Sequence, residues 1–241
     1  ATGKYGPPDE LNMDIGDTRA LFKAGRCGLI VEWGDPGTLQ LDDDASAIKG
    51  KMYAISAVGS KEVLDRATGK LVPVSASTAP YAVDGINYAP FAAFGGWAGA
   101  VNKGADAKTK AAAYAFLSYM NQAAQSGVDV TIGATGYNPY HTSQLASTDL
   151  WVKAGMPQAL ADNYLGAING AINNLNMASD MKIPGAQKYT SVVLDTELAR
   201  YLAGEITVDE ALANIEEGWE EVTEDFGRDE QVASQALALG L

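Results

Sequence analysis

Residues 28–38 (GLIVEWGDPGT) constrain the fold of this chain most, because a short apolar run passes directly into a turn. The run 29–31 predicts a buried strand, since it is short, β-branched and bounded by breakers. The glycines and proline that follow it force the chain to bend. In an open α/β sheet, the loop after the carboxyl end of a strand is where ligands bind. We therefore expect an α/β fold with a ligand-binding loop at this turn.

Trp33 and Asp35 give this turn an aromatic face beside a hydrogen-bond acceptor. The pair suits a sugar or polyol, whose C–H faces stack on indole while its hydroxyl groups donate to a carboxylate. An equally good interpretation is structural: Trp33 packs under a tight turn that Asp35 holds. The sequence leaves both interpretations open.

Two later segments repeat the combination of glycine and aromatic residues. Gly95, Gly96 and Trp97 precede an expected strand of small residues, and paired glycines let a ligand approach the backbone closely. Tyr137 and Asn138 lie in a tight aromatic loop that carries a polar amide. Both segments are candidate walls of the same site.

Most of the remaining chain predicts helices, of which two have clear caps. Asp106 caps one, and Thr207 with Glu210 forms a capping box before another. Trp219 falls on the apolar stripe of the second helix, which predicts a core position. Residues 52–58 predict a further strand. The helices are expected at Thr18–Lys23, Ala107–Asn121, Leu160–Leu175, Ser191–Ala203, 208–226 and Arg228–Leu239.

Residues 60–94 contain no helical period, and we expect a long irregular segment there. Such a segment is usually functional or flexible. It carries Tyr81, Tyr88, Phe91 and Phe94, whose rings either line a site or only fix the segment to the body of the protein.

Composition excludes several classes of function. The net charge is −13, which argues against nucleic acid and against an anionic membrane surface as partners. One cysteine and one histidine leave no set of residues for a zinc site or a thiol protease, so we expect no metal and no cofactor. The sequence has no apolar run long enough to cross a membrane and no signal peptide at its start.

Several motifs together carry a family resemblance. They are ALFKAGRCGLIVEWGD, FGGWAGAVNKGADAKTKAAAYAFLSYM, TGYNPY, IPGAQKY and YLAGEITVDEALANIEEGWEEVTEDFG, in this order over roughly residues 17–230. In order and spacing the chain resembles the carbohydrate-type extracellular solute-binding proteins of ABC transporters, the group that includes maltose-binding protein.

The resemblance implies an α/β, periplasmic-binding-protein-like two-lobe fold (type II), of which this chain is the C-terminal portion. Residues 1–94 and 145–241 would belong mainly to the C-terminal lobe, and residues 95–144 would be contributed to the other lobe. The N-terminal part of such a protein is absent before Ala1. The resemblance also implies a periplasmic or extracellular location.

The resemblance further implies a binding function without catalysis. The ligand, a carbohydrate or polyol, would lie between the lobes and pass to an ABC permease in the membrane. The ligand contacts it implies are Trp33, Asp35, Gly95, Gly96, Trp97, Tyr137, Asn138 and Tyr189. Because one wall of the cleft would be missing, we expect the missing segment, a second chain or a symmetry mate to cover residues 95–101.

Two other functions remain open at this stage. Asp35 and Asp84 could serve as the paired carboxylates of a glycoside hydrolase. Alternatively, residues 60–94 could dock a partner protein, which would make the chain an interaction module.

Overall fold

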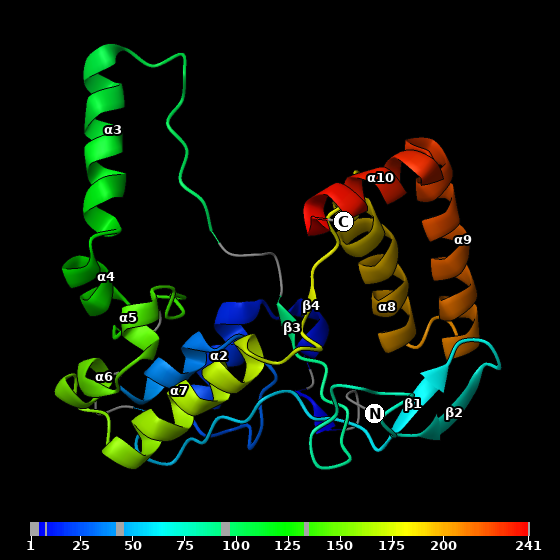
Figure 1. Ribbon diagram of the computed structural model, residues 1–241, viewed down its shortest axis with the longest axis horizontal. Coiled ribbons are helices and arrows are strands. Elements are labelled where there is room, and N and C mark those ends of the chain that lie inside the picture. The colour runs from blue at the N-terminus through cyan, green and yellow to red at the C-terminus, as the bar shows by residue number, and fades with distance from the viewer. Residues whose placement is uncertain (1–4, 8, 42–45, 93–96, 133–134, 241) are drawn as a thin grey trace. The chain divides into compact units, whose positions relative to one another are not determined.

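The structure is a computed structural model, and it describes residues 5–7, 9–41, 46–92, 97–132 and 135–240. It mixes helix and strand and is rich in helix, with 50% of the chain helical and 7% in strands. Its contacts divide it into a large unit, Asp17–Ser179, and a helical unit, Ala1–Gly16 with Asp180–Leu241 (Figure 1). These boundaries differ from those expected near residues 94 and 144, and the assignment of the expected ranges to two lobes stays a prediction.

Among the described residues up to the end of the large unit, short helical elements come first, then three short strands, then five helices and a last short strand. In chain order they are η1 (Glu10–Asn12), α2 (Ile15–Lys23), η2 (Asp35–Gln40), β1 (Glu62–Asp65), β2 (Lys70–Pro73), β3 (Phe91–Ala92), α3 (Ala107–Met120), α4 (Ala123–Asp129), α5 (Thr142–Leu145), α6 (Asp149–Lys153), α7 (Gln158–Ile172) and β4 (Ala178–Ser179).

The core of the large unit forms around α7. Trp151 of α6 packs edge-on against Tyr164 of α7, with ring centroids 6.0 Å apart, and both side chains are fully buried. Gly37 of η2 lies directly on the Tyr164 ring, because a Cβ atom there would be 2.2 Å from the ring. The turn after Trp33 is therefore seated on α7 at a position that only glycine fits.

A second, smaller core cluster joins α2 to the segments that flank the turn. Its buried members are Phe22, Leu39 and Ile48, and Ile30 and Met52 pack against them. This cluster fixes one side of two of the segments that the sequence predicts as strands, at Ile30 and at Met52.

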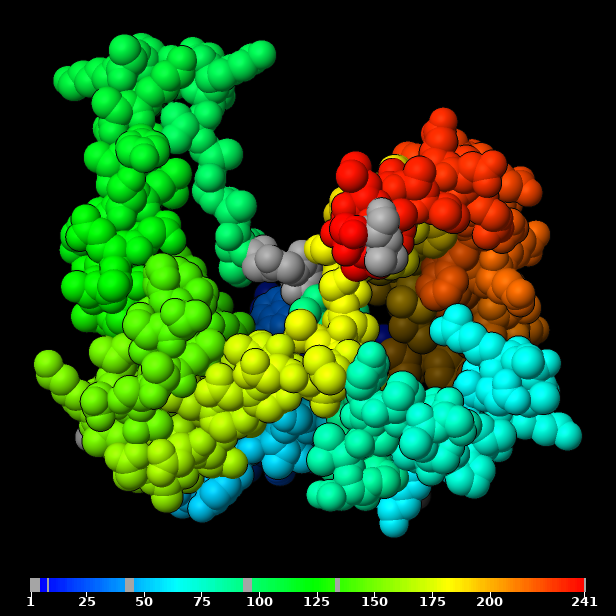
Figure 2. Space-filling model, in the orientation of Figure 1, coloured from blue at the N-terminus to red at the C-terminus, as the bar shows by residue number. Residues whose placement is uncertain are grey.

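The predictions of strands at 29–31, 52–58 and 97–101 are wrong. These segments are extended but pair with no strand among the described residues, and side chains on their outer side are exposed, Val31 by 93%. The apolar patterns are those of strands, but a strand forms only where a neighbouring strand accepts and donates the hydrogen bonds of its backbone. Figure 2 shows the green chain that leads to α3 as a thin run of residues, which meets α3 at Gly99 rather than a strand.

The expectation of an irregular segment at 60–94 is partly wrong, because it contains a β-hairpin. β1 and β2 pair antiparallel, from Glu62 opposite Pro73 to Asp65 opposite Lys70. Gly69 ends the turn with φ +66°, and the Asp65 carboxylate accepts the backbone N–H of Ala67. β3 and β4 form a separate two-residue parallel pair.

The helical unit follows the expected sequence pattern closely. It contains η3 (Lys188–Leu194, a π-helix), α8 (Asp195–Leu202), α9 (Val208–Phe226) and α10 (Arg228–Leu239). The predicted capping box is confirmed, since Thr207 Oγ1 accepts the N–H of Glu210 and Glu210 Oε2 accepts the N–H of Thr207. Trp219 differs from its prediction: it is 37% exposed and lies at the edge of the stripe rather than in the core.

Candidate functional site

The turn at residues 33–37 is held by a buried cluster of charges. Arg19 on α2 donates from Nη1 to Oδ2 of Asp35 at 2.9 Å and from Nε to Oε2 of Glu32 at 3.2 Å. Asp35 is 2% exposed, so its carboxylate lies behind the turn. It supports the turn here, as the structural interpretation expects, and its direct contact with a ligand stays a prediction.

Burial and charge act in opposite directions on this cluster. Burial raises the pKa of Asp35 above the ordinary carboxyl value, although the charge and hydrogen bond of Arg19 lower it. Burial lowers the pKa of Arg19, but the hydrogen bond to Glu32 and the charges of Asp35 and Glu32 raise it overall. Arg19 is therefore firmly charged, and it is the group that makes the buried carboxylates tolerable.

Trp33 presents an aromatic surface above this cluster. Its side chain is 37% exposed, and the guanidinium carbon of Arg19 lies 5.9 Å from the ring centroid. The backbone N–H of Trp33 donates to Oε1 of Glu32 at 2.9 Å, which fixes the start of the turn. Because a cation of the protein already lies against the indole, the exposed ring favours an uncharged partner over a second cation.

Asn138 reaches the same turn from a distant part of the sequence. A Cβ atom on Gly34 would lie 2.7 Å from Asn138 Oδ1 and 3.0 Å from Ile168 of α7, so glycine lets the two loops touch. Tyr137, next to Asn138, is partly exposed. The structure thus brings an aromatic–glycine turn and an amide together, as the sequence suggests for Trp33 and Asn138.

The remaining expected contacts lie in other segments of the chain. Trp97 is 85% exposed, and the chain beyond it approaches α3 at Gly99, where a Cβ atom would be 2.4 Å from Leu117. Gly95 and Gly96 lie outside the described residues. Tyr189 belongs to the helical unit, where it is buried. The ligand contacts implied for these residues stay predictions.

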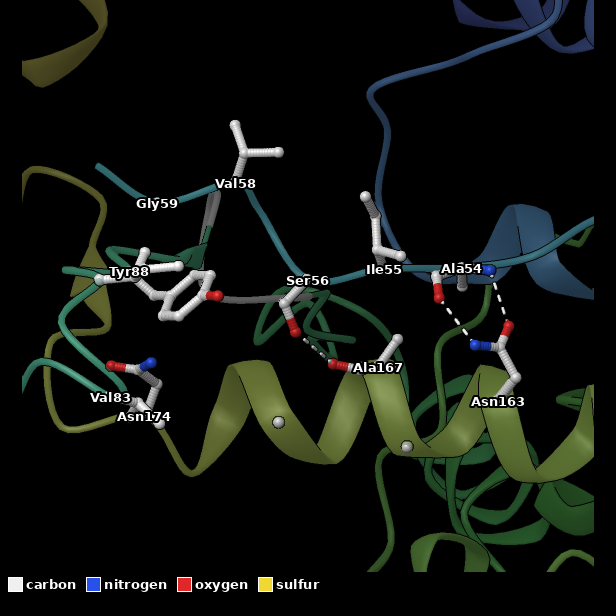
Figure 3. Close-up of a pocket in the computed structure, with 13 residues that line it drawn as sticks. Ala54, Ile55, Ser56, Val58, Gly59, Val83, Tyr88, Asn163, Ala167 and Asn174 are labelled. Atoms are coloured by element: carbon white, nitrogen blue, oxygen red, sulfur yellow. Dashed lines mark hydrogen bonds between the residues drawn. The ribbon is translucent and has the colours of Figure 1, made fainter. Parts of the chain in front are cut away.

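A cavity of about 760 Å³ lies along α7 in the large unit (Figure 3). One wall is the extended segment 54–59, which α7 holds through Asn163: its amide accepts the N–H of Ala54 at 2.8 Å and donates to the Ala54 carbonyl at 2.9 Å. Ser56 Oγ donates to the Ala167 carbonyl at 3.2 Å. Side chains of residues 83–88 close one end.

Small residues on α7 form the floor of this cavity. Gly166 and Gly170 lie one turn apart, and nothing is within 4 Å of the position that a Cβ atom on Gly166 would take. The lining offers amides and hydroxyl groups but no acidic or basic side chain. Sequence reasoning missed the cavity, although the spacing of these glycines on a predicted helix was a signal for it.

The pair of carboxylates suggested for a hydrolase gains no support. Asp35 is bound to Arg19, and Asp84 is exposed at a tight turn with φ +51°, bracketed by the bridge between Val83 and Ile86. Within the described ranges, no three His, Cys, Asp or Glu side chains are grouped to hold a metal ion. In the same ranges, no helix combines the length and hydropathy that a membrane span requires.

Comparison of this chain with protein-family models, with curated proteins and with solved structures found no match. The resemblance to solute-binding proteins therefore rests on its sequence motifs, and the two-lobe fold and the transport function remain to be tested.

Proposed function

We propose that this chain is the ligand-binding component of an ABC importer. It binds a sugar or polyol between two lobes, passes it to a membrane permease and catalyses no reaction. The two-lobe, type II fold and the periplasmic or extracellular location are parts of the same proposal. Both come from the resemblance carried by the sequence motifs.

The observation that carries the binding proposal is the surface formed by Trp33, Gly34 and Asn138. It combines an exposed indole with an amide that can both donate to and accept from hydroxyl groups. Arg19 holds both carboxylates behind it in ion pairs, so neither is free to bind a ligand. An uncharged, hydroxylated molecule with apolar C–H faces fits this chemistry best.

The α7 cavity is a second place for an uncharged molecule in the same unit. Two variants of Gly166 distinguish binding in this cavity from binding at the Trp33 surface. Gly166→Leu places a bulky side chain in the cavity and Gly166→Ala adds only a methyl group, yet both remove the backbone freedom of glycine from the helix. If the sugar binds at Trp33, both variants keep the affinity of the parent chain.

The direct test is a titration with sugars and polyols, and with amino acids and short peptides for comparison. Proton–nitrogen correlation NMR of the four tryptophan indoles detects even weak binding. We expect one or more sugars or polyols to shift the Trp33 signal. If the Trp33 signal responds to amino acids or peptides but to no sugar or polyol, the proposal is wrong.

A further inference from the structure

The helical unit contains a cavity of its own, of about 420 Å³, between α9 and η3. This size suits a small ligand. The walls are apolar and aromatic, and two carboxylates border them. The lining residues are Tyr189, Leu194, Leu212, Ile215, Glu216, Trp219, Glu220 and Thr223.

The indole of Trp219 is held rigidly in this cavity. Its Nε1–H donates to the Tyr189 carbonyl at 2.9 Å, and the Tyr189 ring meets it edge-on with centroids 6.3 Å apart. The Tyr189 hydroxyl is fixed in turn by Thr223 at 2.6 Å and by Gln231. An aromatic face that is anchored in this way and still 37% exposed is ready to receive a ligand without a further cost in ordering.

The charge beside Trp219 is negative. Glu216 and Glu220 lie one turn apart on α9, and Trp219 lies between them in sequence. Arg228 binds Glu220, whereas the Glu216 carboxylate has no hydrogen-bond or ion-pair partner in the described part of the chain. Lys188, the nearest lysine in sequence to the cavity lining, lies 3.5 Å from Asp225 instead.

We propose that this cavity binds a small organic cation with an alkylated ammonium group. The cation would place its methyl groups on the indole of Trp219 and its charge beside Glu216. An aromatic face and a carboxylate attract such a group together, through the ring quadrupole and by direct charge. A net charge of −13 adds a long-range attraction, whereas an anion would be repelled. This cavity shares no lining residue with the surface formed by Trp33, Gly34 and Asn138, and the inference does not rest on the proposed function.

The test uses choline and its uncharged carbon analogue, in which a quaternary carbon replaces the nitrogen. The two molecules have nearly the same shape and differ in charge. Binding is followed in the full chain by the Trp219 indole signal, which a Trp219→Phe variant assigns. We expect choline to shift this signal saturably and the analogue to bind at least about fivefold more weakly.

Two neighbouring substitutions localise the binding. Glu216→Gln removes the carboxylate of the cavity, and we expect it to weaken choline binding about fivefold. Glu217→Gln makes the same change of net charge on a residue that does not line the cavity, and less than about a twofold effect is expected there. The Trp33 signal, followed in the same spectra, separates this result from any response of the sugar-binding surface.

Three outcomes would overturn the proposal. They are a Trp219 signal that choline does not shift, equal affinities for choline and its analogue, and equal effects of Glu216→Gln and Glu217→Gln. The first shows that the cavity does not take this cation. The other two show that the charge beside the indole does not select the ligand.

Discussion

Trp33 and Trp219 are equally exposed, at 37% each, yet the charged group that lies beside the ring differs. The guanidinium of Arg19 lies against Trp33, whereas Glu216 and Glu220 line the cavity beside Trp219. Exposure alone therefore does not say what an indole binds. The neighbouring charge does, and it favours an uncharged ligand at Trp33 and a cation at Trp219.

The two tryptophans also differ in how they are supported. Trp33 depends on a buried ion cluster that joins α2 to the turn, and on Gly34 and Gly37, which let the turn meet Asn138 and Tyr164. Trp219 depends on hydrogen bonds within the helical unit. A substitution that disturbs the residues supporting one tryptophan should therefore leave the ligand response of the other unchanged.

The largest effect is expected from Arg19→Ala. The substitution leaves the buried carboxylate of Asp35 without its cation, which we expect to lower the stability of the large unit by about 3 kcal/mol. Chemical denaturation measures this loss. Arg19→Lys is the control. It restores the positive charge but not the planar guanidinium that binds both carboxylates, so it should recover part of the stability.

The cost of Arg19→Ala should also grow with pH. Burial already raises the pKa of Asp35, and the loss of Arg19 raises it further. The folded state then binds more protons than the unfolded state, so stability is present at low pH and is lost as the pH rises through the folded pKa. Denaturation curves from about pH 4 upward should show the gap between variant and parent widening. A constant gap would contradict this account of the cluster.

Gly34→Ala should have the next largest effect. Its methyl group would meet Asn138 and Ile168, which we expect to cost about 2 kcal/mol of stability and to displace the amide from the turn. Gly28→Ala is the matched control, since nothing lies within 4 Å of the Cβ position there. Equal stabilities of the two variants would show that the turn does not need this close approach.

Trp33→Ala is expected to weaken sugar or polyol binding by about 1–3 kcal/mol while the fold is kept. If Trp33 were a core residue, the substitution would instead cost about 3–5 kcal/mol of stability. Thermal melts with and without ligand distinguish the two outcomes. The response of Trp219 to choline should be unchanged in this variant.

The smallest effect is expected from Thr207→Ala, which removes the cap of α9. A lost cap typically costs about 1 kcal/mol, and the loss should be confined to the helical unit. Hydrogen exchange should become faster in α9 and stay the same in α7. Thr207→Ser keeps the hydroxyl group and should restore the parent rates.

The longer helices were predictable because their signals are local, whereas the short helices α4, α5 and α6 were not among those expected. Asp106 and Thr207 cap α3 and α9 where the sequence suggests, and α10 has the expected bounds. The predictions of strands at 29–31 and 52–58 failed because an apolar pattern does not reveal whether a partner strand is present. The β1–β2 hairpin was missed although Gly69 marks its turn.

The candidate site was predictable only in part. A tryptophan, two glycines and a distant amide suggested that residues 33–34 and 138 share a surface, and Gly34 does meet Asn138. The role of Arg19 could not be read from the sequence, because the contact of α2 with Asp35 spans sixteen residues and depends on packing. The partial exposure of Trp219 was hidden for a similar reason: it lies on the apolar stripe, but no neighbour covers it fully.

The most direct test of the central claim is one set of NMR titrations in which both indole signals are followed. The account predicts that an uncharged sugar or polyol shifts the Trp33 signal and leaves Trp219 in place, and that choline does the reverse. If choline shifts Trp33, or if the same ligand shifts both signals equally, the charge beside each tryptophan does not determine what it binds.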